Sequence, residues 1–315
     1  MYKQMETELD GSKFELESGK VARQADGSAI CSLGDTQVLV TATSGGESDK
    51  PYFPLRVDYE EKFYAGGKIP GGFIKREGRP SDKAVLNARM IDRPIRPLFP
   101  DDYMDELHIV VTVLSASEDY SPGVAGMIGA STALTLSDIP FMGPIAGVEV
   151  GRVDGEFILN PDSSQKEEGD MEIVVAGTGE SVTMVEGEME EVEEDNVVDA
   201  VNFAHERIKK LVDFQLEYAD TEVPDRGSFE KEKGELEKKV AELAEDHLPG
   251  LSGIEKKLER EEKIEKLKEE IKSKLLGEEE RSEDEEKRIE DAVDDEYKKF
   301  VRRKTVKEGV RIDGR

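Results

Sequence analysis

The stretch Phe63–Phe99, FYAGGKIPGGFIKREGRPSDKAVLNARMIDRPIRPLF, is the segment around which the rest of the chain is organised. It contains three acidic residues and eight basic ones, which gives it a local charge of +5 in a chain of 315 residues with a net charge of −29. The basic residues are Lys68, Lys75, Arg76, Arg79, Lys83, Arg89, Arg93 and Arg96. A local excess of positive charge within an acidic chain favours an anionic ligand at this segment.

The first half of this stretch has the composition of a loop. Two glycine pairs, Gly66-Gly67 and Gly71-Gly72, allow the backbone to turn tightly and to approach a ligand closely. Between the second pair and the next turn lies Phe73-Ile74-Lys75-Arg76, which joins an aromatic ring to two cations. This combination suits single-stranded nucleic acid, because a base can stack on the ring while the cations meet phosphates.

The second half is predicted to be a helix that begins after Ser81, a good N-cap residue. Arg89, Arg93 and Arg96 then fall at i, i+4 and i+7, so they share one face and offer a ladder of guanidinium groups to a phosphate chain. Pro94 lies inside this run, where it would kink or end the helix. The residues alone leave a second interpretation open, in which the arginines pair with carboxylates and Phe73 belongs to the core.

The spacing of these motifs resembles a known family. FYAGGKIPGGFIKREGRP followed by ARMIDRPIRPLFP is similar to the first RNase PH-like half of bacterial polynucleotide phosphorylases, and the resemblance extends over essentially the whole chain. It implies a loop that narrows the channel of a trimeric ring and grips single-stranded RNA. The family's usual tip is Phe-Phe-Arg-Arg, whereas this chain has Phe73-Ile74-Lys75-Arg76, which replaces one ring and one guanidinium.

The candidate RNA-binding residues follow from the motif and the resemblance together. Two arginines at the end of the chain, in the segment RIDGR, are further candidates, because this segment resembles the beginning of the family's second RNase PH-like half. The set is Phe73, Ile74, Lys75, Arg76, Arg79, Arg89, Arg93 and Arg96, with Arg311 and Arg315 as the further two.

The remaining charge is distributed unevenly. Residues 1–100 are neutral overall, residues 101–200 carry 24 acidic and 2 basic residues, and residues 201–315 have a net charge of −7. The middle third therefore supplies most of the acidity. No apolar run approaches the ~20 residues of a membrane span, and Met1–Asp10 lacks the apolar core of a signal peptide, so we expect a cytoplasmic protein without a membrane segment. Cys31, in a predicted strand, is expected to be buried and unpaired.

The pattern of apolar residues predicts an α+β fold. Glycine-containing turns at Gly34-Asp35 and Asp154-Gly155 predict hairpins, and Asp195 is predicted to cap a helix. The predicted strands are 13–17, 28–33, 36–42, 55–59, 108–114, 146–153, 156–159, 171–176 and 181–186, and a small-residue helix is predicted over 123–136. By resemblance, this is an RNase PH-like core with a fold similar to domain 2 of ribosomal protein S5.

A highly charged helical region follows. Apolar residues recur every three to four positions over 229–246, 254–276 and 282–301, which predicts three helices. A small all-α domain and a partner-binding coiled coil both fit this pattern, and the family has an all-helical domain here. The predicted organisation is a first RNase PH-like domain (1–141), an RNase PH C-terminal-like subdomain (142–218), a linker (219–228), an all-α domain (229–303) and the start of a second RNase PH-like half (304–315).

No catalytic or metal site is predicted, and loose binding of a cation by Asp162, Asp170 and Glu172 stays open as an alternative. The family places phosphate and metal sites in its second half, in a Ser-rich turn and an acidic segment. The equivalent positions here are Glu118–Gly123, where Pro122 lacks an N–H, and Ser163–Val174, where Lys166 stands for a metal-binding Asp. His108, His205 and His247 lie far apart without a ligand at metal-site spacing, so no zinc site is expected.

The resemblance implies a 3′-to-5′ phosphorolytic exoribonuclease, a polyribonucleotide nucleotidyltransferase that uses inorganic phosphate and, in the full-length protein, Mg²⁺. This chain alone is expected to grip RNA without catalysis. The implied partners are single-stranded RNA, two further copies in a homotrimer, and proteins of the RNA degradosome. Two other hypotheses stay open: a self-contained, non-catalytic RNA-binding scaffold, and a protein-interaction module built on the helical region.

Overall fold

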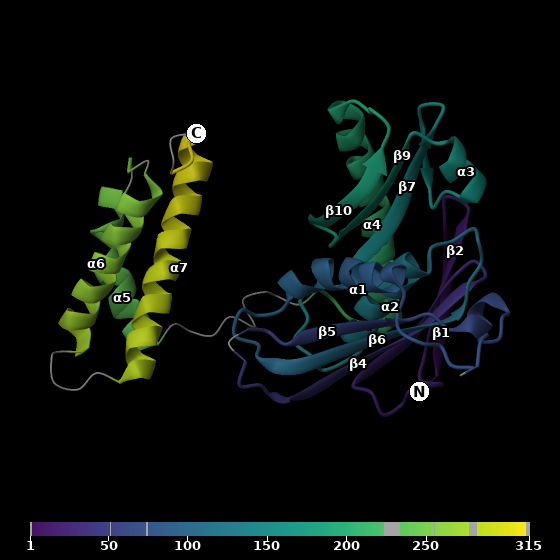
Figure 1. Ribbon diagram of the computed structural model, residues 1–315, viewed down its shortest axis with the longest axis horizontal. Helices are drawn as coiled ribbons and strands as arrows, with labels where there is room; N and C mark the ends of the chain where they lie inside the picture. The colour runs from purple at the N-terminus through teal and green to yellow at the C-terminus, as the bar shows by residue number, and fades with distance from the viewer. Residues whose placement is uncertain are drawn as a thin grey trace. The chain divides into compact units, whose positions relative to one another are not determined.

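The computed structural model describes residues 2–50, 52–73, 75–223, 234–251, 253–254, 256–276 and 282–312. The chain divides near residue 230 into an α+β unit and an all-helical unit (Figure 1). The predicted α+β class followed by a small helical region is confirmed. Within the described ranges, no helix is long and apolar enough to cross a membrane.

Six strands of the first unit form one sheet in the order β1-β2-β3-β4-β6-β5. Neighbouring strands are antiparallel except β5 and β6, which run parallel. Leu33 pairs with Thr36 across the predicted hairpin turn at Gly34-Asp35, which is therefore confirmed. The strands are β1 (Lys3–Leu9), β2 (Ser12–Ser18), β3 (Gly27–Leu33), β4 (Thr36–Glu47), β5 (Leu55–Glu60) and β6 (Asp105–Ser115).

One face of this sheet is buried because apolar residues alternate along its strands. In β6, for example, Leu107, Ile109 and Val111 are buried while the residues between them are partly exposed. The helices α1 (Asp82–Ile95) and α2 (Pro122–Thr135) cover the buried face (Figure 1). The stretch Phe63–Phe99 thus contains a helix that packs on the sheet.

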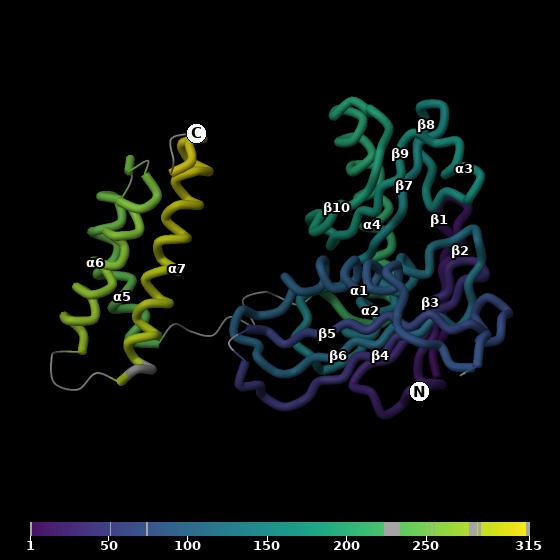
Figure 2. Tube along the Cα trace, viewed as in Figure 1, coloured from purple at the N-terminus to yellow at the C-terminus, as the bar shows by residue number. Residues whose placement is uncertain are grey.

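A second sheet has the order β10-β9-β7-β8, with all neighbours antiparallel. The long helix α4 (Glu194–Ala219) packs on it, and α2 contacts both sheets, so α2 lies between them (Figure 2). The predicted hairpin at Asp154-Gly155 is confirmed. The other elements here are β7 (Ala146–Val153), β8 (Glu156–Leu159), α3 (Ser163–Glu168), β9 (Met171–Gly177) and β10 (Val182–Met189).

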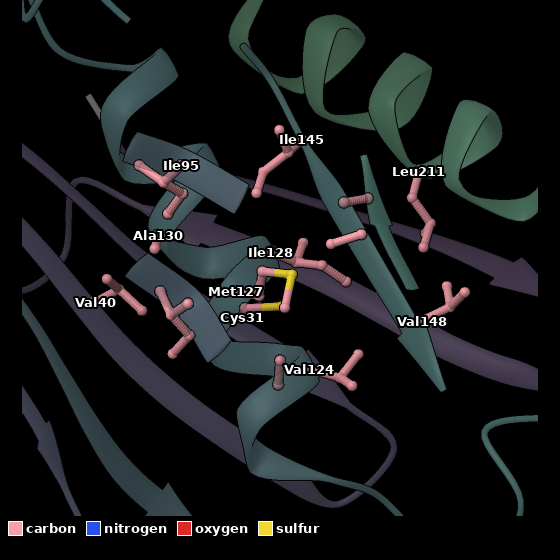
Figure 3. Close-up of a cluster of buried hydrophobic side chains, with 14 of the residues drawn as sticks. Cys31, Val40, Ile95, Val124, Met127, Ile128, Ala130, Ile145, Val148 and Leu211 are labelled. Carbon is pink, nitrogen blue, oxygen red and sulfur yellow. The ribbon is translucent and has the colours of Figure 1, made fainter. Parts of the chain in front are cut away.

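Helix α2 is the centre of the core. Every residue from Gly123 to Leu134 is buried, because small side chains let the helix approach both sheets. A Cβ on Gly27 of β3 would lie only 1.9 Å from the carbonyl oxygen of Ala133, so only glycine fits there. Figure 3 shows side chains from both sheets gathered around Met127 of α2. Among them is Cys31, whose predicted burial is confirmed, and burial raises the pKa of its thiol to about 12.

The described part of the second unit contains the three predicted helices, α5 (Glu235–Glu245), α6 (Lys257–Leu276) and α7 (Glu283–Glu308). Their apolar faces form a separate core that includes Val240, Ile271 and Val293. Helix α7 runs seven residues beyond the predicted end at 301 and through the predicted boundary at 303/304.

Two lysines on the buried side of α6 connect this helix to α7. Lys268 pairs with Asp294 at 3.0 Å and Lys272 with Glu290 at 2.5 Å. Both lysines are largely buried, so each needs its carboxylate partner there.

The structure adds one strand that was not predicted and corrects one predicted helix cap. Strand β1 was not predicted. It is a mostly exposed edge strand, and its many polar and charged residues make the alternation of less exposed and exposed side chains difficult to recognise in the sequence. Asp195 lies in the first turn of α4, where an acid is favourable, and the N-cap is Glu193. Helix α1 ends at Ile95, one residue after Pro94, and is followed by one turn of 3₁₀ helix at Arg96–Leu98, in agreement with the expected kink or end at Pro94.

Candidate nucleic-acid interface

The Gly-rich loop of the first unit (residues 67–80) connects a short 3₁₀ turn, η1 (Phe63–Gly66), to α1. Its described residues form no regular element, and most of their side chains are exposed. Phe73 is fully exposed, and Ile69 is 86% exposed. An aromatic ring without any intramolecular packing is available for stacking, so the interpretation of Phe73 as a core residue is wrong.

The tip of the loop has an unusual backbone. Lys75 adopts a φ of +52°, in the left-handed region, where a residue with a Cβ costs roughly 1–2 kcal/mol. Strain of this kind is concentrated at ligand-binding sites. Lys75 and its neighbour Arg76 are exposed, and neither makes a salt bridge within the described residues.

The base of the loop is held by hydrogen bonds. The backbone N–H of Phe63 donates to Glu77 at 3.0 Å, and the Ser81 hydroxyl donates to Glu61 at 2.8 Å. Ser81 also accepts from the N–H of Ala84 and so caps α1 as predicted. A cavity of about 500 Å³ lies beside these contacts, lined by the end of β5, η1 and the segment before α1. The loop is thus fixed at both ends and exposed at its tip.

The described cations around this loop are mostly unpaired. Arg79, next to the cavity, and Arg89, on the solvent face of α1, are both exposed and make no salt bridge within the described residues. Since Ala84, Ile91 and Ile95 form the buried face of α1, Arg89 and Arg93 lie on the opposite side of the helix as predicted.

The other two guanidinium groups of the predicted ladder already have partners. Arg93 donates to Glu186 on β10. Arg96 forms a bidentate pair with Asp92, at 2.6 and 3.0 Å, and donates to the carbonyl groups of Phe53 and Leu55. The carboxylate-pairing interpretation therefore holds for these two arginines. Arg96 fixes the end of α1 to β5, which leaves Arg89 as the unpaired arginine of the ladder.

Sequence reasoning missed several exposed apolar side chains beside these cations. Tyr64, Val85 and Leu86 are each at least half exposed, as is Ile69 between the two glycine pairs. For Ile69 the signal was its position between glycines. For Val85 and Leu86 it was their place one turn before Arg89, on the helix face opposite Ala84 and Ile91. Together with Phe73 they add apolar contact area to a basic surface.

The positions equivalent to the family's metal segment contain an ammonium group instead. The Lys166 Nζ donates to Glu149 and lies 3.4 Å from Glu172. Glu149 is buried, and its burial together with a hydrogen bond shared with Glu172 raises the pKa of the Glu149 carboxyl to about 7, despite the opposing charge of Lys166.

These residues do not fit a Mg²⁺ ion. The Lys166 ammonium group already contacts both carboxylates, and the neighbouring Asp170 faces Arg152 at 3.8 Å. Within the ranges that the structure describes, no group of three His, Cys, Asp or Glu residues could hold a metal.

The positions equivalent to the Ser-rich turn also lack a phosphate pocket. Pro122 is the first residue of α2 and has no N–H, and the Ser121 side chain makes no capping hydrogen bond. Of the remaining candidates, Arg311 is exposed just beyond α7 and has an intramolecular contact. Ile74 and Arg315 lie outside the described residues.

Comparison with known proteins gives three consecutive family matches. Residues 11–140 match domain 1 of the 3′ exoribonuclease family, and residues 143–207 match its domain 2. Residues 235–315 match the RNA binding domain of polyribonucleotide nucleotidyltransferase. The three matches cover both structural units.

Curated relatives agree with these matches. The chain is 47% identical to the polyribonucleotide nucleotidyltransferase of Oceanobacillus iheyensis, over 98% of this chain and 44% of that protein. It is 46% identical to that of Staphylococcus carnosus, over 99% of this chain and 45% of that protein. The chain thus spans less than half the length of these relatives. On these domains and relatives, it belongs to the polyribonucleotide nucleotidyltransferase family.

Proposed function

We propose that this chain grips single-stranded RNA for a polyribonucleotide nucleotidyltransferase, which shortens RNA from its 3′ end by transferring the terminal nucleotide to inorganic phosphate. The observation that carries the proposal is the tip of the Gly-rich loop. There a fully exposed Phe73 stands next to the unpaired cations Lys75 and Arg76, on a loop whose base is fixed.

This arrangement supports binding that is independent of sequence. Stacking of a base on an aromatic ring contributes about 1–3 kcal/mol and tolerates any base. Lys75 and Arg76 at the loop tip, together with Arg79 and Arg89, contact phosphates, which carry no sequence information. An exonuclease that degrades many RNAs needs this kind of contact.

The acidic remainder of the chain supports confinement of RNA to this surface. Residues 101–200 carry a net charge of −22, which repels phosphates over most of that region. Because the screening length is about 8 Å at physiological salt, this charge acts weakly on contacts made at the exposed loop. RNA is thus attracted by the loop and repelled by residues 101–200.

In this proposal, the groups that catalyse phosphorolysis belong to parts of the full-length protein outside this chain. Lys166, which contacts both Glu149 and Glu172, and Pro122 at the start of α2 supply neither a metal site nor a phosphate pocket. The proposal therefore assigns Mg²⁺ and phosphate binding to the full-length protein. It also includes a homotrimeric ring, partners in an RNA degradosome and a cytoplasmic location, all of which rest on the family resemblance.

A phosphorolysis assay tests the proposal. The purified chain is incubated with 3′-single-stranded RNA, phosphate and Mg²⁺, and both RNA binding and nucleoside diphosphate release are measured. We expect binding without release. The double variant Arg79→Gln/Arg89→Gln should weaken RNA binding. If the unmodified chain binds no RNA, the proposal that this chain grips RNA is refuted. Release that survives repurification and is lost in Glu172→Gln would show that the first half is catalytic.

A further inference from the structure

Helix α7 has a strongly segregated charge. Its first fourteen residues, 283–296, contain nine acidic and two basic residues, whereas residues 297–307 contain six basic residues and no acidic one. The basic residues are Lys298, Lys299, Arg302, Arg303, Lys304 and Lys307. No other segment outside Phe63–Phe99 combines so many cations with so few acids.

The basic half of α7 presents its cations to solvent. Lys298, Arg302, Arg303 and Lys307, here called the basic face of α7, are all exposed. At 100° per residue they span about half of the helix circumference, and Tyr297, Phe300 and Val301 fall on the other half. Tyr297 and Phe300 pack against the core of the second unit, so the basic face is the side turned away from that core.

Intramolecular pairing does not explain these cations. In this part of α7, Lys299 pairs with Glu296 and Lys304 with Glu308. The four residues of the basic face make no salt bridge within the described part of the chain. In a chain of −29, which offers many carboxylates, four unpaired cations on one surface point to an anionic partner.

The helix dipole explains only part of the pattern. A cation near a helix C-terminus is favourable, but the effect is confined to the last turn. In α7 that turn holds Lys307, whereas Lys298 and Arg302 lie one to three turns earlier. The earlier cations gain nothing from the dipole.

We propose that the basic face of α7 binds the phosphate backbone of single-stranded RNA, as a second contact on the helical unit. The inference rests on the proposed function in taking RNA as the ligand, and it assigns the contact to particular residues. Lys298 and Arg302, like Arg303 and Lys307, are one turn apart, about 6 Å along the helix. Two such rows can contact successive phosphates of one strand.

RNA fits this surface better than an acidic protein does. Stable protein interfaces centre on aromatic or large apolar side chains surrounded by polar ones. Among the described residues of this half of α7, Val306 is the one strongly exposed apolar side chain, at 86%. Contacts to phosphate need only cations with freedom to follow the strand. The match of residues 235–315 to an RNA binding domain supports the same choice.

The test compares three double variants of the full chain by fluorescence anisotropy with a labelled 20-nucleotide oligoadenylate at several salt concentrations. Arg302→Gln/Arg303→Gln removes two cations of the basic face. Lys256→Gln/Lys257→Gln removes two other exposed cations of the same unit and is the control. Arg79→Gln/Arg89→Gln removes two cations of the first contact. Thermal unfolding followed by circular dichroism checks that each variant is folded.

The salt slope is the slope of the logarithm of the RNA-binding constant against the logarithm of the salt concentration. Losing two phosphate contacts on a single strand should reduce its magnitude by about 1.4 and weaken binding about tenfold at 0.15 M salt. We expect this for Arg302→Gln/Arg303→Gln and no comparable change for the control. If Arg302→Gln/Arg303→Gln behaves like the control while Arg79→Gln/Arg89→Gln weakens binding, this inference is wrong and the proposed function stands. If the unmodified chain binds no RNA, the proposed function fails. Loss of polyglutamate binding with RNA binding unchanged would identify an acidic protein as the partner and overturn the inference.

Discussion

The ion pair between Arg93 and Glu186 leads to a prediction about RNA affinity. Arg93 lies on the same solvent face of α1 as Arg89, but Glu186 on the edge strand β10 already accepts from its guanidinium. Incoming RNA has to compete with this carboxylate for Arg93. The substitution Glu186→Gln removes the competing charge, so we expect it to strengthen RNA binding.

The exposure of the pair sets the size of the effect. Both side chains are about half exposed, Arg93 at 46% and Glu186 at 51%, so solvent screens their interaction. Exposed pairs of this kind contribute about 0.2–1 kcal/mol, which predicts at most about a fivefold lower Kd for Glu186→Gln. The freed cation should also raise the magnitude of the salt slope by about 0.7.

Fluorescence anisotropy with labelled oligoadenylate at several salt concentrations measures both quantities. Glu188→Gln is the matched control, since it removes the same charge two residues along β10 from a side chain that makes no salt bridge among the described residues. Equal affinities for Glu186→Gln and Glu188→Gln would refute the competition. Arg93→Ala should lower the magnitude of the salt slope of RNA binding. An unchanged salt slope would show that Arg93 does not contact RNA.

Three further predictions follow from particular residues. Phe73→Ala should weaken RNA binding at least fivefold without changing the salt slope, because stacking carries no charge; an altered slope in anisotropy titrations would contradict this. The pKa of Glu149 is raised to about 7 in the folded chain, so the protonated carboxyl stabilises the fold fully below pH 4.5, and this contribution, at most about 3 kcal/mol, is lost as the pH rises to about 7. Glu149→Gln should therefore flatten the pH dependence of the free energy of unfolding measured in urea. An unchanged pH dependence would refute this. Gly27→Ala should destabilise the first unit by about 3 kcal/mol, whereas Gly46→Ala, where a Cβ meets nothing within 4 Å, should have little effect; similar melting temperatures would argue against the tight α2 packing.

Much of the fold could be predicted from local patterns. Strands whose apolar residues alternate toward a buried face, such as β6, and hairpins joined by Asp-Gly turns, such as β7 and β8, appeared near their predicted positions. Their signals are short-range, so a single sequence displays them. Edge strand β1 was missed because exposure allows polar residues on both of its faces.

In the candidate interface too, the features set by neighbouring residues could be predicted, and the contacts formed by the tertiary fold could not. The capping by Ser81 follows from residues close in sequence and was predicted, whereas the sequence left open whether Phe73 is exposed or belongs to the core. The partner of Arg93 is 93 residues away, and no local pattern points to Glu186. The Lys166 contact with Glu149 is likewise formed by the tertiary fold, since it joins α3 to β7. Which cations remain unpaired is therefore a property of the three-dimensional structure.

The central claim is that RNA contacts the Gly-rich loop and the solvent face of α1. Photo-crosslinking tests it most directly, with an oligoribonucleotide containing 4-thiouridine at every third position, followed by proteolysis and mass spectrometry. We predict crosslinks to peptides spanning residues 63–89, with Phe73 among the modified residues, and their loss in Phe73→Ala. Crosslinks confined to other parts of the chain, with none in residues 63–89, would contradict it.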